Sequence, residues 1–308
     1  MDSLRDRPNL ILVERSWCVG AVDRLEQRSQ RAWRVQTAGG RGYFLKLHLD
    51  QQASAAYPVL RQLADQGMRV EVPLPTVNGG VLAEHRGQFF ALYEELPGEP
   101  VDVHGGAAPL RTARALGAAI GQLHRGLAAC SDTMATPLPR ACLLADTLSW
   151  ATRLQCTIGQ SNAAWLGPVV AELDAALGGL GAGLPRQLVH NDCHSGNVIV
   201  DGFGVPGFID FDFMRINLRI FDPCYCLAFL LVDGMGRRFD LDQWPDLQDR
   251  LLAGYDSICP LQVAERAVIT YIVWAALLIN AGWWLQADRH DLSDANLRAL
   301  RWLTGVGS

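Results

Sequence analysis

The chain has 308 residues, of which 49% are hydrophobic and 19% are charged. This length supports a large core and exceeds the usual size of one compact domain, so we expect two lobes. The net charge of −5 argues against a general nucleic-acid binder, because no basic face large enough to neutralise many phosphates is implied.

The cysteines and the start of the chain indicate a reducing compartment. Eight cysteines are scattered along the chain, and the opening residues MDSLRDR carry no apolar signal segment. We therefore expect a cytoplasmic protein. Cys224 and Cys226 lack a second cysteine pair at zinc spacing, so we interpret both as structural thiols.

The first part of the chain is predicted to begin with strands. Three apolar stretches separated by turns form these strands: residues 17–25, 32–37 and 42–48. The sequence AGGRG at 38–42 is a hairpin signal. The turn EQRSQR at 26–31 has no glycine and is either a solvated turn or, with Ser29, a cover for a phosphate group. The second interpretation needs Lys46 nearby, which a third antiparallel strand would supply.

A helix at 53–66 and strands at 81–84 and 88–94 are predicted to complete this sheet-plus-helix lobe, which we place at residues 1–97. The Pro- and Gly-rich sequence EELPGEP at 94–100 is a linker signal. The remainder, residues 98–308, is predicted to be largely helical. Its helices are expected in these ranges: 107–129, two or three within 131–183, 221–231, 241–255, 261–286 and 293–304.

One apolar stretch is long enough to span a bilayer. Residues 267–285 carry no charge, but Thr270, Tyr271 and Asn280 interrupt the stretch, and no charge-biased loops surround it. We therefore expect a buried helix in a large lobe and no membrane association.

The lysine content is unusual. Of 27 basic residues, Lys46 is the only lysine, and it lies inside the apolar run YFLKL. Arginine and lysine differ where a compact ammonium on a flexible stem must reach a phosphate in a tight site. This setting favours a functional role over chance survival of a surface lysine.

Two short apolar runs carry polar side chains at their ends. Asp192 begins a loop after the run LVH, Asn197 follows five residues later, and Asp210 ends the next apolar run. Carboxylate and amide oxygens are the ligands that Mg²⁺ prefers. His190 and His194 leave a transition-metal site as an alternative, although asparagine is a poor partner for zinc.

These residues carry a resemblance to a known superfamily. The sequence HNDCHSGN at 190–197 resembles the H-G/N-D-x-H-x-x-N motif of the aminoglycoside phosphotransferase and choline kinase superfamily, relatives of the protein kinases, and IDFD at 209–212 is similar to its second metal-binding motif. The resemblance extends in the same order from the three predicted strands to the sequence FDP at 221–223. It implies an α+β, two-lobed, protein-kinase-like fold with a small antiparallel-sheet N-lobe and a larger, mainly helical C-lobe.

The resemblance also implies roles for particular residues and for the cofactors ATP (or GTP) and Mg²⁺. The nucleotide would bind residues 1–97, and catalysis and acceptor binding would use residues 98–308. The implied roles are these: Asp192 as catalytic base, Asn197 and Asp210 as Mg²⁺ ligands, Lys46 on the nucleotide phosphates, the backbone of Glu94, Glu95 and Leu96 on the adenine, and His190, His194, Asp212 and Asp222 in support.

The sequence departs from the superfamily pattern after Lys46. The following helix usually supplies a glutamate that pairs with this lysine, but residues 54–60 contain no acid. Glu71 and Glu26 are the candidate substitutes, and ordering of the lysine by the nucleotide is the third option.

The expected function is phosphoryl transfer to a hydroxyl of a small molecule. A natural product or antibiotic is the first choice of acceptor, since tryptophans of the helical lobe such as Trp283 and Trp284 offer an aromatic wall. A primary metabolite of the choline, homoserine or fructosamine type and a Ser/Thr-bearing precursor peptide are alternatives. An alternative of another class is a nucleotide-binding pseudokinase, which the missing acid would favour.

Overall fold

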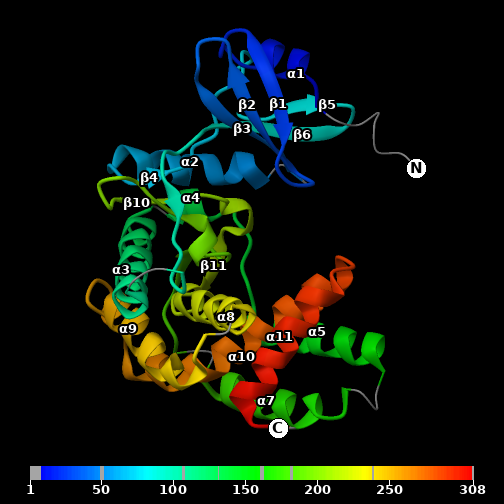
Figure 1. Cartoon of the computed structure of the whole chain (residues 1–308), viewed down its shortest axis with the longest axis vertical. Helices are drawn as coiled ribbons and strands as arrows, with labels where there is room; N and C mark the ends of the chain where they lie inside the picture. Colours follow the sequence, from blue (N-terminus) through cyan, green and yellow to red (C-terminus); the bar gives the residue numbers. More distant parts are fainter. Residues whose placement is uncertain are drawn as a thin grey trace. The chain divides into compact units, whose positions relative to one another are not determined.

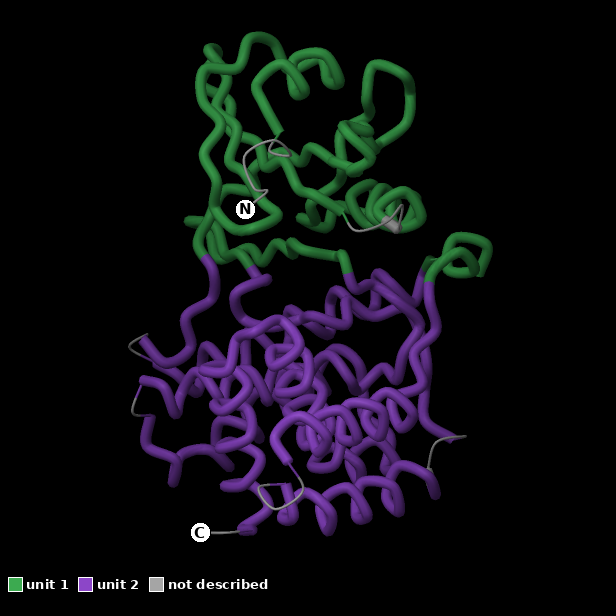
Figure 2. Tube along the Cα trace, turned by 90° about the vertical axis from the view of Figure 1, so that its right-hand side faces the viewer, with its two compact units in different colours: residues 1–99, 130–138, 199–212 green, residues 100–129, 139–198, 213–308 purple. Residues whose placement is uncertain are grey.

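The computed structural model describes most of the chain as two compact units, each drawn in its own colour in Figure 2. The described ranges are 8–48, 52–105, 108–130, 132–159, 163–180, 183–237 and 239–306. The first unit comprises Met1–Glu99, Cys130–Leu138 and Ile199–Asp212, and the second comprises Pro100–Ala129, Pro139–Val198 and Phe213–Ser308. The sequence analysis placed a single boundary after residue 97, whereas this division assigns two later segments to the first unit.

A five-stranded antiparallel sheet with the order β1-β2-β3-β6-β5 forms the centre of the first unit (Figure 1). Its strands have these bounds: β1 Val22–Gln27, β2 Ala32–Thr37, β3 Gly42–His48, β5 Ala83–His85 and β6 Gln88–Glu94. The bounds of β2, β3 and β6 confirm the predicted ranges. Buried side chains alternate with more exposed ones along β2 and most of β3, as one buried face requires, and Val35, Leu45 and Phe90 lie in the core of this sheet.

The first predicted strand was wrong at its start, because a helix precedes it. Helix α1 spans Leu10–Ser16, and the side chain of Asn9 caps it by accepting a hydrogen bond from the N–H of Leu12. Trp17 ends the helix and is buried in the core, where its indole N–H donates to the carbonyl oxygen of Leu74 at 3.2 Å. The strand therefore begins only at Val22, after the chain has turned.

The segment Ile199–Asp212 is joined to the rest of the first unit by a parallel pair of strands. Strand β10 (Pro206–Phe208) pairs in parallel with β4 (Arg69–Val70), which follows helix α2 (Gln52–Asp65). Strand β4 was not predicted, since it is too short to show a periodic pattern, whereas β10 lies at the second of the two apolar runs, which suggested a strand leading to Asp210. The pairing places Asp210, two residues after β10, in the same unit as β3.

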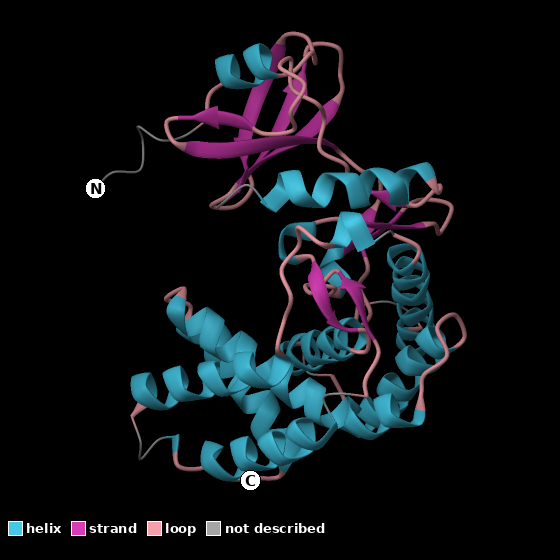
Figure 3. Cartoon of the chain, turned by 180° about the vertical axis from the view of Figure 1, so that it is seen from behind, coloured by secondary structure: helices cyan, strands magenta, loops and turns pink. Residues whose placement is uncertain are grey.

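Helices make up most of the second unit (Figure 3). Its helices are α3 Pro109–Ala128, α5 Leu143–Ile158, α7 Leu166–Leu180, α8 Phe221–Gly236, α9 Trp244–Asp256, α10 Val263–Gln286 and α11 His290–Thr304. The shorter elements of the chain are β7 Glu99–Pro100, α4 Asp132–Ala135, β8 Arg186–Val189, η1 Ser195–Asn197, β9 Val198–Val200, η2 Phe211–Phe213, β11 Arg215–Leu218 and η3 Leu241–Gln243. Strands β8 and β11 pair antiparallel. The expected helix at 107–129 begins at Pro109, and residue 107 lies outside the described residues.

Helix α10 contains the apolar stretch that the sequence analysis weighed as a membrane span. Among the described residues it is the one helix long and apolar enough to cross a bilayer, with a mean hydropathy of 1.7 over its most apolar window. Of that window, 61% is buried, and the helix packs against α5, α7, α8 and α11. These contacts make α10 a central helix of the second unit.

Helices α3 and α9 approach each other closely at two glycines. A Cβ atom at Gly117 would clash with the carbonyl oxygen of Leu251, and one at Gly254 would clash with the carbonyl oxygen of Arg114. Both positions therefore require the absence of a side chain. This close approach positions α3, whose His124 contributes to the site described below.

We expect Gly254→Ala to lower the free energy of unfolding by about 1–3 kcal/mol, because the added methyl group forces the two backbones apart. Urea denaturation measures this change. Gly179→Ala in α7 is the matched control: its Cβ would meet no atom within 4 Å, so the higher helix propensity of alanine should leave stability unchanged or slightly raised. Equal stability of the two variants would contradict the close approach of α3 and α9.

Candidate active site

Lys46 lies in the middle of β3, between Ala32 of β2 and Ala91 of β6. Its side chain is 12% exposed, and its Nζ lies 2.7 Å and 2.9 Å from the two carboxylate oxygens of Glu71. The same Nζ lies 3.6 Å from a carboxylate oxygen of Asp210. The only lysine of the chain is therefore held between two acids inside the first unit.

Glu71 is the acidic partner that the helix after Lys46 does not supply. It directly follows β4, and its N–H donates to the carbonyl oxygen of Phe208 in β10 at 3.1 Å. Its carboxylate also accepts a hydrogen bond from the N–H of Asp210 at 2.6 Å. Glu26, the other candidate, instead forms ion pairs with Arg24 and Arg28 on the exposed strand β1. The structure thus decides for Glu71.

The acids around Lys46 determine its charge state. Burial acts to lower the pKa of Lys46, but the carboxylates of Glu71, Asp210 and Asp212 outweigh this effect and raise the pKa above its usual value. The side chain therefore remains a cation at neutral pH. The ring of Tyr93 lies beneath it, with the centroid 5.1 Å from Nζ.

Asp210 and Asp212 differ in their surroundings. Asp210 has a positive φ of 67°, a conformation that few residues other than glycine adopt, and its side chain is 43% exposed. Asp212 lies 3.4 Å from the Nδ1 of His48, whose Nε2 lies 3.2 Å from the hydroxyl of Tyr93. Asp210 thus presents its carboxylate to solvent, whereas Asp212 is tied to the sheet.

The turn that carries Ser29 is closed by its own hydrogen bonds. The Oγ of Ser29 accepts a hydrogen bond from the N–H of Arg31 at 3.2 Å, and the N–H of Ser29 donates to the carbonyl oxygen of Ala32 at 3.1 Å. Because Ala32 pairs with Lys46, the turn lies at the end of the strand next to this lysine, as its interpretation as a phosphate cover requires. The covering role itself stays a prediction.

Of the linker residues, Glu94 ends β6, and Glu95 and Leu96 follow it. The N–H of Glu95 donates to the carbonyl oxygen of Gly42 at 3.2 Å, and its carboxylate accepts hydrogen bonds from the guanidinium of Arg34. The N–H and side chain of Glu95 are therefore engaged within the sheet. Adenine contact by the backbone of this segment stays a prediction, in which the carbonyl of Glu94 and the N–H of Leu96 are the groups to test.

A buried carboxylate holds the loop after β8 in the second unit. The two oxygens of Asp222, the second residue of α8, accept hydrogen bonds from the N–H groups of His190 and Asn191, both at 2.8 Å. The Nε2 of His124 in α3 donates to the same carboxylate at 2.8 Å, and its Nδ1 lies 2.8 Å from the hydroxyl of Tyr255 in α9. Asp222, His124 and Tyr255 are fully buried, so these bonds compensate the cost of burying a charge.

The next residue, Asn191, has a positive φ of 68° and receives a hydrogen bond from the side chain of Asn217 at 2.9 Å. Asparagine and glycine tolerate this left-handed conformation better than other residues. This backbone requirement explains why the position between His190 and Asp192 holds an asparagine.

Asp192 lies in this loop with both carboxylate oxygens hydrogen-bonded. The hydroxyl of Tyr225 in α8 donates to Oδ1 at 2.6 Å, and the Nδ2 of Asn197 donates to Oδ2 at 3.2 Å. The same Nδ2 donates to the backbone carbonyl of Asp192 at 2.9 Å. Since the amide nitrogen of Asn197 serves Asp192, its amide oxygen is directed away from the loop.

The two histidines of the loop have structural contacts. His190 is fully buried, with its Nδ1 3.4 Å from the N–H of Asp192. His194 accepts a hydrogen bond from the N–H of Gly196 at its Nδ1, and its ring stacks on Phe229 at a centroid distance of 4.3 Å. Within the described residues, no group of three or more His, Cys, Asp or Glu side chains is arranged to hold a metal ion. The transition-metal alternative therefore gains no support.

Comparisons with known proteins place the chain in a family. The sequence pattern of the phosphotransferase enzyme family matches residues 23–266. The chain belongs to this family. The homoserine kinase of Xanthobacter autotrophicus is 27% identical over 252 residues, covering 79% of this chain and 73% of that protein. The homoserine kinase of Neisseria meningitidis serogroup B is 33% identical over 115 residues, covering 37% of this chain and 35% of that protein. Some of these relatives are thus matched over less than two thirds of their length.

Solved structures of this family share the fold. An aminoglycoside phosphotransferase from Alicyclobacillus acidocaldarius superposes with a TM-score of 0.71 at 15% identity, covering 99% of this chain and 97% of that one. A microcompartment-associated aminopropanol kinase superposes with a TM-score of 0.71 at 19% identity, covering 93% and 94%. These neighbours confirm the predicted kinase-like α+β fold, with its antiparallel sheet and its helical part.

The chemical type of the oxygen donors in this phosphotransferase suits a magnesium ion. Asp210 exposes its carboxylate, and Asn197 directs its amide oxygen away from the loop. Mg²⁺ usually takes one or two protein oxygens, and water and phosphate oxygens complete its shell, so a large cluster of acidic ligands is not required. The assignment of these two residues as ligands stays a prediction.

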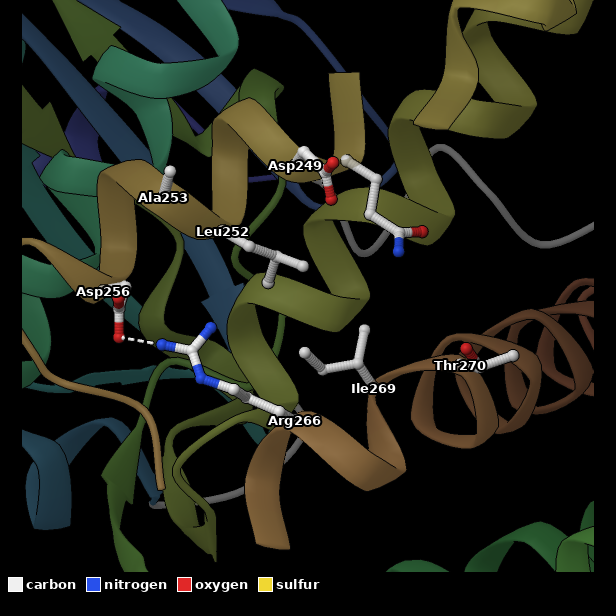
Figure 4. A pocket seen from close by; sticks show the side chains of 8 residues that line it. Asp249, Leu252, Ala253, Asp256, Arg266, Ile269 and Thr270 are labelled. Atoms are coloured by element: carbon white, nitrogen blue, oxygen red, sulfur yellow. Dashed lines mark hydrogen bonds and ion pairs between the residues drawn. The ribbon is translucent and has the colours of Figure 1, made fainter. Parts of the chain in front are cut away.

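One hollow of about 440 Å³ lies between α9 and α10 and is lined by none of the candidate site residues (Figure 4). Its lining consists of Gln248, Asp249, Leu252, Ala253, Asp256, Arg266, Ile269 and Thr270. The guanidinium of Arg266 donates to Asp256 at 2.7 Å across it. This ion pair ties the start of α10 to the end of α9, and we interpret the hollow as structural.

Sequence reasoning missed three side chains that hold the site. No site role was assigned to His124, Tyr225 or Tyr255, although Tyr225 lies three residues after Asp222 in a predicted helix. Residues three apart in a helix share a face, so the contact of Asp222 with the loop placed Tyr225 near it as well. Tyr255 gave no comparable signal, since its partner His124 is 131 positions away.

We expect Glu71→Ala to lower the free energy of unfolding by about 3 kcal/mol or more, because it leaves the ammonium of Lys46 buried without its nearest carboxylate. Chemical denaturation measures the loss. Glu26→Ala is the control: its ion pairs are exposed, so the change should stay within about 0.5 kcal/mol. If the two variants lost equal stability, Glu71 would not be the partner of Lys46.

Proposed function

We propose that this protein transfers the γ-phosphoryl group of ATP or GTP to a hydroxyl group of a small molecule. The observation that carries the proposal is the placement of Asp192 in a loop anchored by the buried carboxylate of Asp222, with Asn197 hydrogen-bonded to the same aspartate. A second observation is the sole lysine, which is buried and held as a cation by Glu71 and Asp210. Both clusters occur in a chain of the phosphotransferase enzyme family.

The chemistry assigns one task to each residue. Asp192 accepts the proton of the acceptor hydroxyl as the new O–P bond forms, and the bond between the γ-phosphorus and its bridging oxygen breaks, which releases the nucleoside diphosphate. Lys46 binds oxygens of the non-transferred phosphates. Asn197 and Asp210 hold Mg²⁺, which neutralises phosphate charge when it is bound. His190 and Asp222 fix the loop, so that Asp192 does not have to be ordered by the substrate.

The pairing of Lys46 with Glu71 bears on the pseudokinase alternative. That alternative was favoured only by the missing acid in the helix after Lys46. Because Glu71 takes this place from a different element, the observation no longer separates this chain from an active kinase.

For the acceptor we propose a small hydroxylated amine or amino acid. The support is that several relatives between 25% and 34% identical are homoserine kinases. A cationic aminoglycoside would need a carboxylate-rich pocket, but two C-terminal acids have basic neighbours: Asp288 lies 3.1 Å from His290, and Asp291 pairs with Arg289 at 3.0 Å. A natural product, the first choice in the sequence analysis, is therefore the second candidate here, supported by Trp283, which is 40% exposed and offers apolar contact.

We expect the wild-type protein to transfer phosphate from ATP or GTP in the presence of Mg²⁺, and Asp192→Ala to lower turnover by about 10²–10⁴-fold through loss of the base. A phosphate-transfer assay over a panel of L-homoserine, amino alcohols, aminoglycosides and Ser/Thr peptides measures this. Asp65→Ala, which removes an exposed aspartate paired with Arg61, is the control and should leave turnover unchanged.

Turnover of Asp192→Ala at the parental rate would overturn the assignment of the base. Nucleotide binding without turnover of any acceptor by the wild-type protein would favour the pseudokinase.

A further inference from the structure

Helix α8 is buried along most of its length but leaves two aromatic residues partly accessible. Between Phe221 and Leu231, Tyr225 and Phe229 are the two positions that are not buried. They lie four residues apart and so share one face of the helix. Both contact the loop after β8, residues 190–197, which we call the catalytic loop. Tyr225 binds Asp192, and the ring of Phe229 stacks on the ring of His194. The partly accessible face of α8 is therefore the face next to the proposed base.

The hydroxyl of Tyr225 is held by the carboxylate of the loop. It donates to the Oδ1 of Asp192 at 2.6 Å, a short distance typical of a hydrogen bond to a carboxylate. Burial, together with the charge of Asp192, raises the pKa of Tyr225 well above its usual value, so the phenol keeps its proton and remains a donor.

We propose that Tyr225 is a positioning residue for phosphoryl transfer, which holds the carboxylate of Asp192 in the orientation that accepts the proton of the acceptor hydroxyl. This inference rests on the proposed function. The Asn197 bond alone, at 3.2 Å to Oδ2, leaves the carboxylate able to rotate about its χ2 angle, and the Tyr225 bond to Oδ1 removes this freedom.

The burial of α8 distinguishes this role from that of a substrate mimic. A tyrosine that merely occupied the place of the acceptor hydroxyl would have to leave Asp192 before catalysis, and its removal would speed turnover or lower the KM for the acceptor. The backbone of Tyr225 lies in a helix whose neighbouring residues are buried, so its hydroxyl is held at Asp192. The loss of such a hydroxyl should slow turnover.

The test compares Tyr225→Phe with the parent protein, using MgATP with L-homoserine as the acceptor and, separately, MgATP hydrolysis with water as the acceptor. We expect kcat to fall about tenfold, less than the loss caused by removing the base itself, while the KM for ATP and the melting temperature stay at the parental values. A purely structural role would instead lower the melting temperature. Tyr271→Phe removes a phenol hydroxyl from α10, where the ring packs on Trp274, and is the matched control.

A double-mutant cycle separates this inference from the proposed function. In an Asp192→Asn background, Tyr225→Phe should cause no further loss of residual turnover, because the carboxylate that it positions is gone. If Tyr225→Phe kept the parental kcat or turned over faster while Asp192→Asn remained impaired, the positioning role would be overturned. If Asp192→Asn kept parental turnover, the proposed function itself would fail.

Discussion

The carboxylate of Asp222 is the constraint on which the second unit's part of the site depends. It is fully buried, so it must be supplied with hydrogen-bond donors, and the available donors are two N–H groups of the catalytic loop and the imidazole of His124. These bonds join α3, α8 and the loop after β8 at one point. The position of Asp192 follows from this junction, because Asp192 comes directly after Asn191, whose N–H and left-handed backbone are both fixed.

The first unit also contains a buried charged group, but its charge is positive. A buried ammonium costs free energy unless carboxylates surround it, and Glu71 and Asp210 provide them for Lys46. Glu71 also receives the N–H of Asp210, so one glutamate fixes both the lysine and the acid proposed to hold the metal. The ammonium group of a lysine at this place can readily move from a carboxylate to a phosphate oxygen, because an ammonium group does not require a planar arrangement of its partner. An arginine would demand a bidentate partner, which is consistent with lysine being kept here alone.

The sequence was sufficient for the strands β2, β3 and β6, for most helices of the second unit and for the contiguous motif around Asp192. These features depend on local periodicity or on residues a few positions apart. What it did not reveal depends on long-range pairing: β4 is too short to show a pattern, and its parallel pairing with β10 is what brings Glu71 and Asp210 to Lys46. Helix α1 was not predicted, and its seven residues end directly before the range assigned to the first strand.

The same distinction explains why the reaction is easier to infer than the acceptor. Asp192 and Asn197 are five residues apart, so their hydrogen bonds are formed within one loop and leave a short sequence motif. The side chain that binds Asp192 from outside the loop is Tyr225 of α8, 33 positions further along the chain. This spacing is set by helix packing and leaves no motif. Acceptor choice should therefore be sought on the face of α8 that carries Tyr225, rather than at Asp288 and Asp291, which lie beside neighbouring basic side chains.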